Sequence, residues 1–133
     1  MALSHFRELN PAFEPAEDWA NCYFENVQRN ASYSLRWIMA DQVRAGFVLY
    51  GIEQHHFLPR QAGAIYELYV RPANRRKGIA KACVERVLDE LWKVPVSKVQ
   101  LEVVEANSAA KQFWRSLGFE RVSERFALSN PLR

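Results

Sequence analysis

The sequence predicts a single α/β domain built on a mixed, mostly antiparallel sheet, and three observations support this prediction. The chain has 133 residues, of which 49% are hydrophobic and 25% charged, as in one globular domain. Helical and strand patterns follow in the order α-α-β-β-β-α-β-α-β. A helical pattern over residues 76–93 separates two strand-like runs, which predicts one parallel crossover within the sheet.

The first part of the chain predicts two helices and a hairpin. A short helix over residues 3–9 would be closed off by Pro11, and a second is expected over 14–28, where apolar residues recur along one stripe. Residues 32–40 and 44–52 are rich in aromatic and branched side chains, which is typical of paired strands.

The second part predicts alternating strands and helices. Pro72 stops a strand, Pro95 breaks the chain before the next one, Asn107 is a plausible N-cap, and Gly118 suits a helix end. The expected elements are a loop at 54–63, a strand at 65–70, a helix at 76–93, a strand at 98–105, a helix at 108–117 and a last strand at 119–128.

The segment 64–90 carries the clearest chemical signal. Its strand runs into a basic loop, Arg75-Arg76-Lys77-Gly78-Ile79-Ala80, and from there directly into a helix. The first N–H groups of a helix lack partners within it, and the small residues Gly78 and Ala80 would let a pyrophosphate approach them. The spacing of this loop is that of neither a nucleotide P-loop nor a Rossmann glycine fingerprint.

The loop resembles the pyrophosphate loop of the GNAT superfamily of N-acetyltransferases, R/Q-x-x-G-x-G/A, whose ligand is acetyl-CoA. A later segment is similar to the family's second signature: Leu101-Glu102-Val103, then Asn107-Ser108-Ala109-Ala110, an aromatic pair and Gly118-Phe119. The resemblance covers roughly residues 43–128 and implies one GNAT domain over 1–133, with one splayed parallel strand pair. The family's first strand is missing here, so the strand at 32–40 would be an open edge that a homodimer partner could cover.

The resemblance also implies the contacts with acetyl-CoA. The pantetheine amides would pair with the backbone of the strand ending at Val70, whose N–H would also hold the developing oxyanion. The basic loop and the start of the following helix would meet the phosphates. The expected cofactor-binding residues are Leu68, Tyr69, Val70, Arg75, Arg76, Lys77, Gly78, Ile79, Ala80, Lys81, Asn107 and Trp114.

Two glutamates are candidates for the general base that takes the proton of the acceptor amine. Glu67 lies directly before the pantetheine segment, where related polyamine-type acetyltransferases place an acidic residue. Glu102 matches the base of ribosomal-protein N-terminal acetyltransferases. For each, the plain alternative is a strand carboxylate that faces outward and pairs with Lys or Arg. Trp114 stands where many members carry a Tyr that protonates the leaving thiolate, and an indole cannot replace that acid.

The predicted function is therefore N-acetyl transfer from acetyl-CoA to a primary amine of a small molecule or peptide, by direct attack. The alternative is a non-catalytic CoA-binding regulatory module.

His55, His56 and Arg60 lie in a loop where acceptor specificity often resides in this family. The histidines and cysteines show no metal-ligand spacing, and we expect no metal.

Composition also bears on the partners and the compartment. Acidic residues are interspersed with the basic ones nearly everywhere, so the net charge of +3 argues only weakly for nucleic acid, and none is expected. The sequence has no apolar run of about 20 residues, and its N-terminus lacks a secretory h-region. We therefore expect no membrane contact and a cytoplasmic protein.

Overall fold

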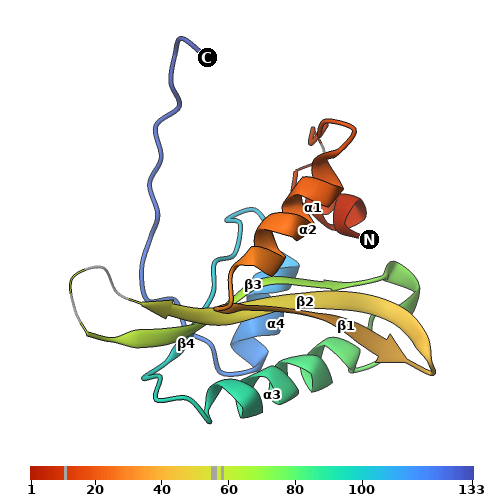
Figure 1. Cartoon of the computed structure of the whole chain (residues 1–133), viewed down its shortest axis with the longest axis vertical. Helices are drawn as coiled ribbons and strands as arrows, with labels where there is room; N and C mark the ends of the chain where they lie inside the picture. Colours follow the sequence, from red (N-terminus) through yellow and green to blue (C-terminus); the bar gives the residue numbers. More distant parts are fainter. Residues whose placement is uncertain (11, 55–56, 58) are drawn as a thin grey trace.

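One four-stranded sheet, in the order β1-β2-β3-β4, forms the centre of the computed structural model (Figure 1). The structure describes residues 1–10, 12–54, 57 and 59–133. Its elements are α1 (Ala2–Leu9), α2 (Trp19–Arg29), β1 (Tyr33–Ala40), β2 (Val43–Gln54), β3 (Gln61–Val70), the 3₁₀ turn η1 (Pro72–Asn74), α3 (Ile79–Leu91), β4 (Val99–Gln100) and α4 (Ser108–Ser116). The predicted mixed α/β fold is confirmed.

β1, β2 and β3 form an antiparallel meander. Asp41 and Gln42, with φ of 50° and 65°, make the two-residue turn between β1 and β2, which matches the twist of a tight hairpin. Between β2 and β3 the register shifts, so that Tyr66 is an extra residue just before Glu67. Such a bulge re-aims the neighbouring side chains and is common beside active sites.

β3 and β4 form the predicted parallel pair, joined by the crossover helix α3. Their pairing is short, because only Gly63 with Val99 and Ala64 with Gln100 are in register. Beyond these pairs β3 continues to Val70, whereas residues 101–105 carry no strand assignment. The two segments therefore part along the C-terminal half of β3.

Two apolar clusters lie on opposite faces of the sheet. One consists of residues from the sheet with Val84, Val87 and Leu91 of α3, and side chains of α4 pack against it. The other joins Phe47 and Tyr69 of the sheet to α1 and α2. The sheet is thus covered by α1 and α2 on one face and by α3 and α4 on the other (Figure 1).

Three boundaries differ from those predicted. α2 begins at Trp19 rather than at residue 14, because Pro15 disfavours helical backbone at the residue before it and a turn from Ala16 to Trp19 precedes the helix. β3 begins at Gln61, inside the predicted loop, because it pairs with the equally extended β2. The central strand expected over 98–105 is reduced to Val99–Gln100.

The prediction of a last strand at 119–128 is wrong. This segment runs away from the domain without regular structure, and the alternating side chains of Val122, Phe126 and Leu128 are exposed (Figure 1). Alternation is necessary for a half-buried strand but not sufficient, since a strand forms only where a neighbour completes its ladder. No described segment pairs with these residues.

The outer edge of β1 has no strand neighbour among the described residues. A second copy that covers this edge stays a prediction. In the described part of the chain, no helix has both the length and the apolar character needed to cross a bilayer.

Candidate functional site

The backbone of Leu68 and Val70 faces the opening between β3 and residues 101–105. The N–H of Arg71 donates to the carbonyl of Ala45 at 2.7 Å, and a side chain at Gly46 would collide with the carbonyl of Tyr69. Tyr69 and Arg71 therefore direct their backbone groups at β2. Because these groups alternate along a strand, those of Leu68 and Val70 point to the other side, where β4 has already ended. This is the edge an extended ligand could pair with.

The start of α3 lies beside that edge and fits an anionic group. Gly78 occupies the N-cap position of the helix with a φ of 77°. A Cβ added there would meet no atom within 4 Å. The helix ladder begins with Ala82 N–H donating to the Gly78 carbonyl at 3.1 Å, and no described side chain caps the first turn. The preceding N–H groups therefore remain available to a phosphate.

The basic side chains of this loop differ in their surroundings. Arg76, Lys77 and Lys81 are exposed, and Lys81 has a loose contact of 4.0 Å with Glu85. Three long cationic side chains around a helix start that no described side chain caps can neutralise a polyphosphate. The open space at Gly78 and these charges fit the pyrophosphate of acetyl-CoA.

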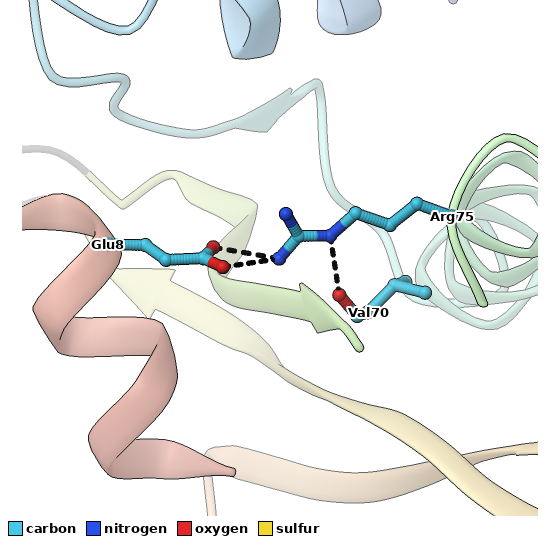
Figure 2. A network of polar contacts seen from close by, with 3 residues as sticks. All are labelled: Glu8, Val70 and Arg75. Carbon is cyan, nitrogen blue, oxygen red and sulfur yellow. Dashed lines mark hydrogen bonds and ion pairs between the residues drawn. The ribbon is translucent and has the colours of Figure 1, made fainter. Parts of the chain in front are cut away.

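Arg75 is engaged differently (Figure 2). Its Nε–H donates to the carbonyl oxygen of Val70 at 2.7 Å, and its Nη2 lies 2.7 Å from both carboxylate oxygens of Glu8 in α1. The guanidinium also lies over the ring of Tyr69, 5.5 Å from the centroid. Arg75 thus connects α1 with the open edge of β3, and its contact with phosphate stays a prediction.

Glu67 lies on the face of the sheet that α1 and α2 cover. Its Oε2 contacts the Nε2 of His5, a buried residue of α1. The Tyr23 hydroxyl of α2 is also buried and has no hydrogen-bond partner among the described residues. Burial, and next the charge of Glu67, raise the pKa of Tyr23 to about 12, so its hydroxyl stays protonated at neutral pH. Sequence patterns missed His5 and Tyr23, because they belong to helices far along the chain from β3.

Glu102 has a different environment. Its side chain is 77% exposed and accepts a hydrogen bond from Nη1 of Arg125 at 2.8 Å. Of the two predicted bases, only Glu67 is partly enclosed and lies next to the open edge of β3.

The residues of α4 have structural partners. The Asn107 side chain accepts from the N–H of Ala110 at 3.1 Å, which confirms the predicted N-cap. Trp114 packs against the α3 face of the sheet, with ring centroids 5.0 Å from Phe113 and 5.2 Å from Phe119. A contact of either residue with coenzyme stays a prediction.

Two predicted specificity residues, His55 and His56, lie outside the described residues, whereas Arg60 is exposed. Within the described ranges, no group of three or more His, Cys, Asp or Glu side chains could hold a metal ion.

Comparisons with known proteins identify a family for this chain. A family model described as the acetyltransferase (GNAT) family matches residues 2–119. An L-ornithine N5-acetyltransferase of Arabidopsis thaliana is 32% identical over 84 residues, which are 63% of this chain and 37% of that protein. A ribosomal protein bS18-alanine N-acetyltransferase of Escherichia coli is 36% identical over 61 residues, 46% of this chain and 41% of that protein.

Among solved structures, a ribosomal-protein-alanine N-acetyltransferase of Brucella melitensis biovar Abortus superposes with a TM-score of 0.73 at 18% identity. The match covers 97% of this chain and 87% of the other. At that identity the likeness concerns the fold alone. The chain spans well under half the length of either curated relative.

Proposed function

The chain belongs to the GNAT acetyltransferase family, and on this basis we propose that it moves an acetyl group from acetyl-CoA to a primary amine. The observation that carries the proposal is a juxtaposition within one segment. The open backbone edge at Leu68–Val70 is followed by the uncapped start of α3 and preceded by the partly enclosed carboxylate of Glu67.

The donor would be held mostly by backbone. Leu68 and Val70 would pair with the pantetheine amides as an added strand does, and the Val70 N–H would stabilise the developing oxyanion. The N–H groups from Gly78 to Lys81 would bind the pyrophosphate, supported by Arg76, Lys77 and Lys81. Bound acetyl-CoA would supply the activated acetyl thioester.

Glu67 would take the proton of the acceptor amine, which an alkylamine with a pKa near ~10 must lose before it can attack. Glu102 is the second candidate, and its exposed pair with Arg125 makes it the weaker one. Transfer would be direct, since neither coenzyme motif contains a Cys that could carry the acetyl group. Burial raises the pKa of the nearby Cys83 to about 11, so its thiol stays protonated and is a poor nucleophile.

The acceptor class is proposed to be a cationic small-molecule amine or a peptide amine. The carboxylate of Glu67 favours a positively charged acceptor, and the curated relatives are named for an amino acid, ornithine, and for a protein alanine. The two free cysteines suit a reducing cytoplasmic setting, which is part of the same proposal.

Thiol release from acetyl-CoA tests the proposal. The purified protein is incubated with acetyl-CoA and L-ornithine, a polyamine, an aminoglycoside or a peptide with an N-terminal alanine, and acetylated products are identified by mass spectrometry. We expect saturable turnover with at least one amine. Tight binding of acetyl-CoA without turnover on any of them would instead support the non-catalytic CoA-binding module.

A further inference from the structure

We infer that His5 is a positioning residue for Glu67, so that helix α1 fixes the orientation of the carboxylate that receives the amine proton. The inference rests on the proposed function and adds to it a residue outside both coenzyme motifs. His5 lies 62 positions before Glu67 in the chain.

The surroundings of His5 leave its imidazole one polar contact. The ring lies among aromatic rings, with centroid distances of 5.0 Å to Phe6 and 5.6 Å to both Phe47 and Tyr69. Within the described residues, the only polar group that its side chain contacts is Oε2 of Glu67. A buried polar group without a partner is costly, so this contact holds both side chains in place.

Exposure assigns different roles to the two side chains. The His5 side chain is 8% exposed and that of Glu67 is 20% exposed, so an acceptor reaches the carboxylate and the imidazole lies behind it. When the Nε2–H of His5 donates to Oε2, the other oxygen, Oε1, can face the amine. Oε1 makes no hydrogen bond to any described residue.

The proton balance keeps His5 unchanged. The acceptor ammonium gives one proton to Oε1 of Glu67, and its lone pair then forms the C–N bond to the acetyl carbon. The C–S bond breaks, its electron pair leaves with the sulfur, and the second proton that the new amide nitrogen must lose passes to this thiolate directly or through water. His5 keeps its own proton throughout, so it orients Glu67 without taking part in the transfer.

The Tyr23 hydroxyl of α2 lies near the same carboxylate but makes no hydrogen bond to it. It is buried and senses the charge of Glu67, so α1, α2 and β3 each bring a polar group to this position. Among the described residues, the hydrogen bond that holds the carboxylate therefore comes from His5 of α1, and it restricts the positions of Glu67 more narrowly than those of a free side chain.

The test is a double-mutant cycle with acetyl transfer to the best amine as readout. His5→Leu removes the donor and keeps apolar bulk, whereas His5→Gln keeps an N–H donor. We expect His5→Leu to lower kcat/KM for the amine about 10- to 100-fold, with Kd for acetyl-CoA unchanged within about 2-fold. His5→Gln should recover most of the loss. In the Glu67→Gln background, His5→Leu should cost less than about 2-fold, because its effect passes through the carboxylate.

Phe13→Leu is the matched control, because Phe13 packs against Phe6 of α1 and Trp19 of α2 and has no ring contact with His5 among the described residues. It should loosen α1 and leave kcat/KM within about 3-fold. Equal losses from His5→Leu in both Glu67 backgrounds, or equal losses from His5→Leu and His5→Gln, would overturn the inference. If Glu67→Gln slows transfer and neither His5 variant does, His5 alone loses its role. If the unmodified protein transfers no acetyl group, the proposed function itself fails.

Discussion

The carboxylate of Glu8 holds the guanidinium of Arg75, whose Nη2 lies 2.7 Å from both carboxylate oxygens (Figure 2). Because the same guanidinium donates to the carbonyl of Val70, one side chain ties helix α1 to the open edge of β3. α1 also carries His5, the partner of Glu67. The proposed donor and acceptor sides are thus both anchored to one short helix.

Glu8→Gln is expected to strengthen acetyl-CoA binding by up to about 5-fold. The Glu8–Arg75 pair is roughly half exposed, and such pairs contribute about 0.2–1 kcal/mol, so releasing it frees a cation for phosphate at little cost in stability. Isothermal titration calorimetry measures the affinity. Glu25→Gln, which removes the same charge from an exposed pair in α2, should leave it unchanged. Weaker binding by Glu8→Gln would mean that the tether holds the loop in its binding form.

Gly78→Glu is expected to lower acetyl-CoA affinity at least about 100-fold, because a carboxylate would occupy the anion position at the start of α3. The substitution also forces a side chain into left-handed backbone, at a cost of about 1–2 kcal/mol. Gly118→Glu is the matched control, because Gly118 also has a positive φ, of 94°, and equally open surroundings, so that the substitution adds the same charge in left-handed backbone. The midpoint temperature of thermal unfolding should fall by a similar amount in both variants. Only Gly78→Glu should lose affinity for acetyl-CoA. Equal affinities would refute the assignment of the loop.

The strand, loop and helix of the proposed coenzyme site could be predicted because they are adjacent in sequence. A strand, Gly78 and a helix follow within a few residues, and the proposed binding of the coenzyme would use their backbone. The partners of Glu67 and Arg75 could not be predicted, since His5 and Glu8 lie 62 and 67 positions away and meet them only when α1 packs on the sheet.

In the C-terminal segment, a local sequence pattern predicted a strand that the structure does not contain. Alternation at Val122, Phe126 and Leu128 is typical of a strand, yet a strand is completed by its neighbour and not by its own residues. The side chains of Arg125 and Glu102 meet there without a backbone ladder.

Glu67→Gln is expected to lower kcat about 10²- to 10⁴-fold with acetyl-CoA affinity nearly intact, because it removes a general base and keeps the shape of the side chain. Glu102→Gln is the comparison, since it makes the same change in the other predicted base. It should leave kcat within about 2-fold, because Glu102 is exposed and contacts only Arg125 among the described residues. Steady-state kinetics with saturating amine measures both. The reverse order of effects would assign the base to Glu102.

Neither cysteine is expected to carry an acetyl group. Burial raises the pKa of Cys83 to about 11, and Asp18 raises that of Cys22, so both are thiols rather than thiolates near pH 8. The variant with Cys22→Ser and Cys83→Ala should keep kcat within about 2-fold. Double-reciprocal plots of the initial rate against one substrate, at several concentrations of the other, should intersect, as expected for a ternary complex. Parallel lines, together with lost activity in this variant, would indicate a covalent intermediate.

Tyr23→Phe is expected to stabilise the protein by about 1 kcal/mol near pH 7, because it removes a buried hydroxyl with no hydrogen-bond partner among the described residues. The advantage should grow with pH. An unfolded Tyr ionises near ~10, whereas Tyr23 in the fold stays protonated up to about 12, so the stability of the unsubstituted protein is lost as pH rises through this window. Urea unfolding of both proteins between pH 7 and 11 measures the difference. A variant that is less stable at pH 7 would mean that the hydroxyl has a partner, and a difference that stays constant with pH would contradict the raised pKa.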